Sequence, residues 1–280
     1  MDTSGAIRQA LQLWRKKEPW FYSRFIFNEY TYYFLSLSII SLALASLMVY
    51  PISHLLAACA IGYFLSQFIF QFGHMTTHAL YVESPVEDWE PGVVVAWLHH
   101  YIHPRAIYDH WLIHRLNFIM QTKGCAVAYI GAWIAPFALF GTSLALLYIW
   151  FLFWFLMVEP VHEWYHVPKG VRKSHFSAPV YYWLSLLSFV QILDEEGHLE
   201  HHRHSLSNAE KVTKFSDLYS PCADMIFDRL WGMALAARNK QLFKTSPIRK
   251  TIYLQGVLLI PLVFSFSAWL FYFACENFQF

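Results

Sequence analysis

Charged residues are scarce in this sequence. Asp, Glu, Lys and Arg make up only 14% of its 280 residues, whereas 57% are hydrophobic and 19% are aromatic. Soluble domains carry about one quarter charged residues, so this composition excludes an ordinary soluble monomer. It also excludes a disordered chain, which would be rich in charge and poor in large apolar residues.

Cysteine motifs, basic charge and nucleotide-binding motifs are lacking as well. The four cysteines have no CxxC spacing and predict neither a disulfide framework nor an iron–sulfur cluster. A net charge of +1 gives no basic excess for binding nucleic acid. The chain has no GxGxxG motif for a nicotinamide or flavin and no CxxCH motif for haem. Any redox chemistry would therefore need electrons from another protein.

Three long segments contain no charged residue at all. They cover residues 31–73, 124–158 and 251–275, and each is longer than the roughly 20 residues that cross a bilayer as a helix. Tyr50-Pro51 divides the first segment, and Gly141-Thr142-Ser143 divides the second. The sequence therefore predicts an all-α integral membrane protein with about five transmembrane helices, as two hairpins and a C-terminal span, over residues 31–49, 52–73, 124–140, 143–159 and 252–275.

The segments between these spans are rich in Lys and Arg. Two hairpins return the chain to its starting side, so residues 1–30, 74–123 and 159–250 are predicted on one face, which the positive-inside rule makes cytoplasmic. We interpret the chain as a single domain with an interfacial N-terminal segment (1–30) and a helical cytoplasmic cap. In the cap, the apolar stretch 178–193 is too short to span comfortably and is predicted as an in-plane helix. It would form a wall of a substrate entrance or dock the cap on the membrane.

Histidine is abundant, and 14 of the 15 histidines lie in the predicted cap. Residues i and i+4 share one face of a helix, so this spacing presents two imidazoles to one metal ion. Imidazole suits Zn, Cu, Fe and Ni alike. A catalytic zinc needs three protein ligands, whereas this set is large enough for two metals. The spacing recurs in four places: His74 and His78, His110 and His114, His162 and His166, and His198 with His201 and His202.

The histidine motifs resemble a known family. The lipid desaturase family that includes plasmanylethanolamine desaturase and the plant plastid desaturase acting on phosphatidylglycerol has similar motifs in the same order. The matching stretches are His74-Met-Thr-Thr-His78, His100-Tyr-Ile-His103-Pro104-Arg-Ala106-Ile107-Tyr-Asp-His110, His162-Glu-Trp164-Tyr-His166 (HxWxH) and His198-Leu-Glu-His201-His202 (HxxHH). Ser220-Pro221 and residues 228–232 also resemble the fatty acid hydroxylase and sterol desaturase superfamily. The last span has no counterpart in these families that we can place.

The resemblance implies a non-haem di-iron enzyme. It would bind two iron ions, use O2 as co-substrate, and take electrons from a ferredoxin or a protein of the cytochrome b5 type. The implied activity is desaturation of the acyl or alkyl chain of a membrane lipid, and hydroxylation by the same centre is the alternative. His78 and His103 stand where the family has aspartate, and we expect them to be ligands too. The expected metal ligands are thus His74, His78, His100, His103, His110, His162, His166, His198, His201 and His202.

Two other classes of function are open to test. A membrane zinc hydrolase would use three histidines and leave the others unexplained. A metal transporter or haem-carrying electron-transfer protein would need ligands inside the spans, where only His54 lies. We interpret His54 as a packing residue, and His175 and His204 as solvated.

Acidic residues flank the histidine motifs. Metal-bound imidazole usually donates its other N–H to a carboxylate or carbonyl, so Glu159 and Glu163 are predicted to support the ligands from behind. Residues 194–196, Asp-Glu-Glu, are either a similar support or a solvated helix start. Pro160 is predicted to kink or end the helix that precedes it.

Overall fold

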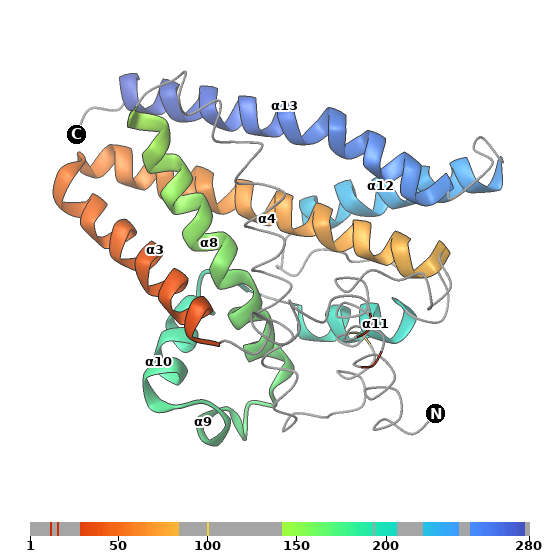
Figure 1. Ribbon diagram of the computed structural model, residues 1–280, viewed down its shortest axis with the longest axis horizontal. Coiled ribbons are helices and arrows are strands. Elements are labelled where there is room, and N and C mark those ends of the chain that lie inside the picture. Colours follow the sequence, from red (N-terminus) through yellow and green to blue (C-terminus); the bar gives the residue numbers. More distant parts are fainter. Residues whose placement is uncertain are drawn as a thin grey trace.

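The computed structural model describes residues 12, 16, 29–83, 100, 142–192, 194–205, 221–240 and 247–277, and over these residues the chain is helical with no strand. The predicted all-α class is confirmed for this part of the chain. In Figure 1, α4 runs through the molecule beside α8 and α13. The helices are α3 (Glu29–Val49), α4 (Ile52–Glu83), α8 (Thr142–His166), α9 (Arg172–His175), α10 (Ala178–Leu187), α11 (Glu195–Ser205), α12 (Pro221–Asn239) and α13 (Pro247–Asn277).

Three of these helices are long and apolar enough to cross a membrane. Their apolar stretches are Ile52–Thr76, Leu144–His166 and Ile248–Asn277, in α4, α8 and α13. A shorter apolar stretch, Leu37–Val49, lies in α3. Four predicted spans thus coincide with helices. The fifth, 124–140, lies outside the described residues, as does most of the N-terminal segment.

The turn between α3 and α4 lies where the sequence has a proline. Tyr50 still donates its N–H to the Ser46 carbonyl, over 3.1 Å. Pro51 has no N–H with which to continue that ladder. Its carbonyl instead accepts the N–H of Leu55 over 3.1 Å, which starts α4. The local chemistry of one residue therefore sets the boundary between the first two apolar helices.

Both α4 and α8 continue past their predicted spans and carry histidines on the added turns. α4 runs on to Glu83, and α8 runs through Pro160 to His166, so Pro160 does not end that helix. A proline inside a helix costs about 3 kcal/mol. Burial of the neighbouring Val158 and Val161, each 3% exposed, offsets this cost. The histidines of both helices consequently lie on regular helix rather than on loops.

Glycines allow α4 to approach two neighbouring helices closely. A Cβ atom on Gly62 would lie 2.8 Å from the backbone nitrogen of Phe151 in α8. A Cβ atom on Gly256 of α13 would lie 2.7 Å from Cε1 of Phe72 in α4. Only a residue without a side chain fits at such distances. The three long apolar helices therefore form one packed unit with α4 at its centre.

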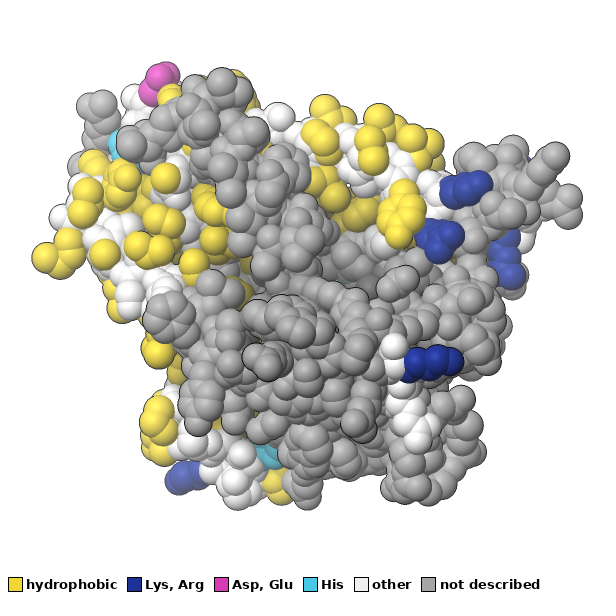
Figure 2. Space-filling model, viewed as in Figure 1, with side chains coloured by type: hydrophobic (Ala, Val, Ile, Leu, Met, Phe, Trp, Pro, Cys, Tyr) yellow, Lys and Arg dark blue, Asp and Glu magenta, His cyan; other side chains and the backbone are white. Residues whose placement is uncertain are grey.

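The outward faces of α3 and α13 are apolar. Met48 in α3 is 89% exposed and Val257 in α13 is 71% exposed, with many apolar neighbours on the same faces. Figure 2 shows these hydrophobic side chains spread over the left and upper parts of the molecule, whereas most of the visible Lys and Arg lie at the right. Such a wide apolar surface suits contact with lipid chains rather than with water.

Candidate metal centre

Four buried histidines form the first group, called here the α4 group. His74 and His78 lie on α4, His201 lies on α11, and His100 comes from the chain between α4 and α8. Nε2 of His74 lies 3.0 Å from Nε2 of His78 and 3.2 Å from Nε2 of His100. Nε2 of His201 lies 3.0 Å from that of His78. All four side chains are at most 7% exposed.

Four more histidines form the second group, called the α8 group. His162 and His166 lie on α8, and His198 and His202 lie on α11. Nε2 of His198 lies 2.6 Å from that of His162, 2.8 Å from that of His202 and 3.0 Å from that of His166. Three of these residues are buried and His166 is half-buried.

α11 supplies histidines to both groups because of its helical geometry. Successive residues of an α-helix are turned by about 100°. His198 and His202, four residues apart, therefore share a face, and both belong to the α8 group. His201 is turned by about 100° from His202, and it belongs to the α4 group. The HxxHH motif thus presents adjacent histidines to two different sites.

The convergence of the Nε2 atoms indicates a cation site. A neutral imidazole nitrogen in the ring plane has either one N–H or one lone pair. Nε2 of His198 has three other Nε2 atoms within 3.0 Å and cannot be hydrogen-bonded to all of them. Four lone pairs directed at one point are instead stabilised by a positive ion. The residues present therefore fit a metal ion in each group.

The spacing of the nitrogens agrees with one ion per group. At a metal–nitrogen distance of about 2.1 Å, neighbouring ligands lie about 3.0 Å apart at right angles and about 3.4 Å apart at tetrahedral angles. The close pairs in the α4 group are 3.0–3.2 Å apart, and those in the α8 group are 2.6–3.0 Å apart. All four nitrogens of each group lie within 4.8 Å of one another, which is close enough for one ion to be bound among them.

The two groups are direct neighbours. The ring centroids of His100 in the α4 group and His202 in the α8 group are 4.6 Å apart. Those of His201 and His202 are 5.9 Å apart. Two ions held by these groups would therefore share one binuclear centre.

Gln71 orients one ligand of the α4 group from behind. Its Oε1 lies 3.4 Å from Nδ1 of His74, and its side chain is 1% exposed. An amide oxygen can only accept, so this contact is a hydrogen bond in the tautomer with the proton on Nδ1 of His74, which leaves the lone pair of Nε2 for a metal. On the other side, Trp231 of α12 is 2% exposed and packs with its ring 6.5 Å from that of His78. The α4 group is thus both oriented and covered.

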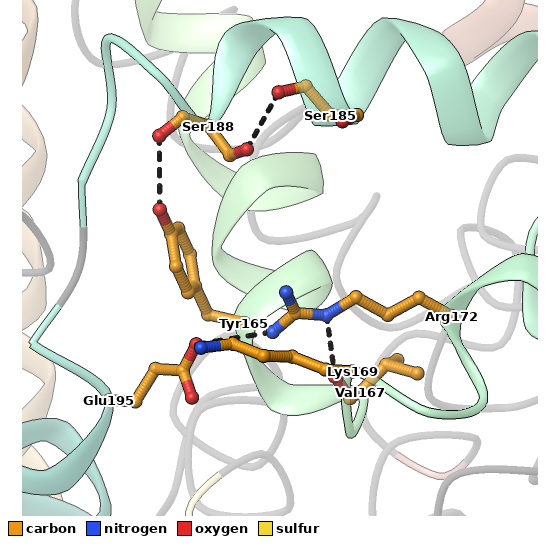
Figure 3. A network of polar contacts seen from close by, with 7 residues as sticks. All are labelled: Tyr165, Val167, Lys169, Arg172, Ser185, Ser188 and Glu195. Carbon is orange, nitrogen blue, oxygen red and sulfur yellow. Dashed lines mark hydrogen bonds and ion pairs between the residues drawn. The ribbon is translucent and has the colours of Figure 1, made fainter.

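Arg172 connects the two helices that form the α8 group (Figure 3). It follows the end of α8 and donates from Nε to the Val167 carbonyl over 2.8 Å and from Nη2 to Glu195 over 3.3 Å. Its guanidinium also lies 4.8 Å above the ring centre of Trp164. The arginine side chain is 8% exposed. It therefore holds the end of α8 against the start of α11.

The acidic run at 194–196 starts α11. Asp194 Oδ1 accepts the N–H of Gly197 over 3.2 Å, and the Asp194 carbonyl accepts the N–H of His198 over 2.8 Å. This is an N-cap, which satisfies a backbone donor at the helix start. Glu195 is engaged by Arg172 and also lies 3.6 Å from Nζ of Lys169. Asp194 and Glu195 therefore fix the helix that carries three ligands, rather than only facing solvent.

Eight of the ten expected ligands come together in the two groups. Sequence reasoning placed His78 among them although the resembling family has aspartate at that position, and it lies in the middle of the α4 group. His54 contacts the Cys275 carbonyl over 3.3 Å and ties α4 to α13, as expected of a packing residue. His103 and His110 lie outside the described residues.

The expectation that His175 is solvated is wrong. Its side chain is 9% exposed and lies 3.9 Å from Glu163, against the ring of Phe176. His175 of α9 thus lies against α8, as does Arg172 of the same helix, above the ring of Trp164. Glu163, predicted to support a metal ligand, has its carboxylate 3.9 Å from Nε2 of His175, and its support of a ligand stays a prediction. The side chain of Glu159 lies outside the described part, and His204 is 35% exposed.

Sequence reasoning missed Gln71 and Arg172. A glutamine inside an apolar span, three residues before a histidine, is a signal that would have found Gln71. No comparable signal exists for Arg172, because its partner Glu195 is distant in the sequence. The motifs indicate which histidines could bind a metal, and the tertiary structure shows which other side chains orient those histidines.

Comparison of the chain with family models, curated proteins and solved structures finds no match. Its function therefore has to be inferred from the residues and geometry of the two groups and from their motifs.

Proposed function

We propose that this protein is a membrane oxidoreductase that holds two iron ions in its two histidine groups and uses O2 to desaturate the acyl or alkyl chain of a lipid. The observation that carries the proposal is the pair of adjacent four-histidine groups, joined through α11 at the ends of two apolar helices. Eight nitrogen ligands suit iron. The order and spacing of the motifs resemble those of lipid desaturases.

The chemistry divides between metals and protein. Two iron ions bound there would supply the activation of O2 and the removal of hydrogen from an unactivated carbon. The chain holds the imidazoles in place through Gln71 and Arg172. Burial of seven of the eight histidines keeps water away from the ligands. Electrons would come from a partner of the ferredoxin or cytochrome b5 type.

Hydroxylation is the second candidate function. Trp231 belongs to residues 228–232, the stretch that resembles the fatty acid hydroxylase and sterol desaturase superfamily, and it packs against His78. The same centre would then deliver oxygen to the substrate carbon instead of removing a second hydrogen. Product analysis separates the two, because one gives an alkene and the other an alcohol.

The directions of the helices support a site on one side of the membrane. α4 and α8 both carry their histidines near the C-terminal end, and α11 supplies histidines to the groups of both helices. Two spans that run in the same direction need a return crossing between them. The predicted span at 124–140, outside the described residues, would provide it. We propose five spans with the metal centre on the cytoplasmic face, in keeping with the positive-inside rule.

Cysteine-accessibility labelling tests this topology. Reporters at Lys16, Glu87 and Lys211 should be labelled from the cytoplasmic side, and a reporter at Gln279 from the opposite side. Labelling of the Glu87 and Lys211 reporters from different faces would contradict the proposal. The hydrocarbon core is about 30 Å thick, too thick for ligands on its two sides to form one centre.

Metal and product analysis tests the function. The purified protein should contain two iron ions per chain, and cells that make it should accumulate a lipid with an additional double bond. His201→Ala should abolish that product while the protein still inserts in the membrane. His204→Ala is the matched control, since His204 lies on the same helix but in neither group. One zinc ion per chain would instead indicate a zinc hydrolase.

A further inference from the structure

Residues 176–192, called here the α10 segment, are apolar and free of charged residues. The segment contains α10 and the turns that follow it, between α9 and α11. Its helix, α10, has only 10 residues, and an apolar helix of 10–14 residues is more often a buried, re-entrant or interfacial element than a span. Its contacts decide between these three.

Contacts with α8 and α4 show that the α10 segment reaches far along both helices. Trp183 packs edge-on against Phe153 of α8, with ring centroids 6.3 Å apart. Phe153 precedes His162 by nine residues, which is about 14 Å of helix. Tyr63 of α4 donates its hydroxyl to the Val190 carbonyl over 3.2 Å and precedes His74 by eleven residues, about 16 Å of helix.

Phe153 and Tyr63 both lie near the middle of apolar stretches long enough to span a membrane. Half of a hydrocarbon core is about 15 Å. With the histidines placed at the edge of the apolar layer, the α10 segment would extend about halfway into that layer. It enters after α9 and returns to α11, so both of its ends are on the side of the metal centre.

Backbone carbonyls at the end of α10 are satisfied within the protein. The last carbonyls of a helix have no partner in that helix, and in water they bond to solvent. In a bilayer each such group needs a partner from the protein. Here the Ser188 carbonyl accepts the hydroxyl of Tyr165 over 3.1 Å, and the Ser185 carbonyl accepts that of Ser188 over 2.8 Å (Figure 3).

The remaining bonds follow the same pattern. The Val190 carbonyl accepts the hydroxyl of Tyr63, and the N–H groups of the turns after α10 donate to carbonyls of that helix. Those bonds are Ser188 N to Leu184 O (2.9 Å), Phe189 N to Leu186 O (3.2 Å), Val190 N to Leu187 O (3.0 Å) and Gln191 N to Leu187 O (2.9 Å). Six carbonyls of the segment, those of residues 184–188 and 190, thus have a partner within the protein, as backbone at membrane depth needs. Both polar atoms of the buried Gln191 side chain have none among the described residues.

The outward side chains of the α10 segment are apolar. Phe189 is 77% exposed, Leu186 is 60% exposed and Val190 is 52% exposed. In Figure 2 hydrophobic side chains continue down the left side of the molecule, below those of α3, toward the place that α10 occupies in Figure 1. The segment therefore extends the apolar surface of the spans.

We propose that the α10 segment is a re-entrant element that inserts among the lipid acyl chains beside α8, on the side of the membrane where the metal centre lies. Leu186, Phe189 and Val190 contact acyl chains directly. The depth of the contacts, the absence of charge and the satisfied carbonyls all favour acyl chains over headgroups. The inference rests on the proposed membrane integration, and it replaces the in-plane helix expected from the sequence.

Site-directed spin labelling in liposomes tests this inference. Single cysteines at Leu186 and Phe189 carry a nitroxide, in a full-length background whose native cysteines are changed to alanine and whose metal content is unchanged. Accessibility is measured to O2, which concentrates in hydrocarbon, and to a polar nickel complex, which stays in water. A label at Leu258, 57% exposed on α13, is the reference for lipid. A label at Lys173, exposed on α9, is the reference for water.

The labels at Leu186 and Phe189 should match the Leu258 label, with high access to O2 and low access to nickel. Access to nickel equal to that at Lys173 overturns the inference, because the segment then faces water. Low access to both reagents overturns it too, because protein then covers the surface. If the Leu258 label itself is open to nickel, membrane integration fails, and that result is distinct from failure of the re-entrant element alone.

Discussion

The two histidine groups hold the same number of imidazoles but are built differently. The α4 group draws on α4, α11 and His100, its four members are buried, and α12 covers it through Trp231. The α8 group uses only α8 and α11, and His166 is half-buried. The α4 group therefore forms only when three parts of the chain come together. The α8 group depends on the relative position of two helices.

This difference indicates which substitutions would weaken metal binding in each group. In the α8 group, two pairs with i, i+4 spacing face each other, so each helix already presents its ligands correctly. The spacing between α8 and α11 is then what matters, and Arg172 sets it. In the α4 group, the orientation of individual rings matters more, and Gln71 fixes one of them. Changes to these residues should affect one group and spare the other.

The largest effect is expected from His201 and His202, adjacent residues assigned to different groups. His201→Ala and His202→Ala should each bind one iron per chain instead of two, and neither should form product. The double variant of both should bind none. By contrast, His78→Ala combined with His201→Ala removes two ligands of the same group and should still bind one iron. Elemental analysis of the purified variants measures this.

Equal iron content in the two double variants would show that the assignment of adjacent histidines to separate groups is wrong. His204→Ala serves again as the control on the same helix, and it should keep both ions.

The next effect is expected at Gln71. Gln71→Leu removes the oxygen that orients His74, and loss of such a partner typically weakens metal binding about 10–100-fold. Only the α4 group should lose affinity, so chelator titration should become biphasic, with one ion released early. Gln67→Leu is the control: Gln67 is also a buried glutamine of α4, and its amide bonds to Ser66 rather than to a histidine. A uniform loss of both ions in Gln71→Leu would count against its role.

The smallest effect is expected at Arg172. Arg172→Ala removes two hydrogen bonds and a contact with Trp164, and hydrogen bonds to charged groups contribute about 1.5–3 kcal/mol each. Partial relaxation of α11 should reduce this to about a tenfold loss of affinity, or about 1.4 kcal/mol, confined to the α8 group. Lys169→Ala is the matched control, because Lys169 reaches the same carboxylate from an exposed position (77% exposed). Exposed pairs contribute about 0–1 kcal/mol. Metal affinities equal to those of the wild type in both variants, measured by chelator titration, would contradict the role of Arg172 in holding α8 against α11.

Much of the fold follows from charge-free runs in the sequence. The helices α3, α4, α8 and α13 lie where such runs predicted spans, since burial of apolar side chains is nearly independent of partner identity. Boundaries were less predictable. Pro160 was expected to kink or end its helix, and α8 continues through it, so Pro160 does not end the helix; the buried neighbours Val158 and Val161 offset the local cost.

For the site, the motifs indicated which histidines could bind metal but not which of the two groups each histidine joins. The i, i+4 rule pairs His74 with His78 and His162 with His166 from sequence alone. His175 shows the limit: its isolated position in the sequence suggested solvent, and the return of α9 onto α8 buries it beside Glu163. Contacts between residues distant in the chain produce no periodic pattern in the sequence, so burial of this kind could not be predicted from it.

By itself, the sequence determined the helical class, the apolar runs of the long helices and the histidines that could bind metal, because hydrophobicity and helical spacing act locally. The tertiary structure alone decided that His201 joins His74, His78 and His100, and that Arg172 fixes α8 to α11. It also decided that the α10 segment reaches the level of Tyr63. Each of these depends on the packing of distant helices, and close approaches such as that at Gly62 set the distances between them.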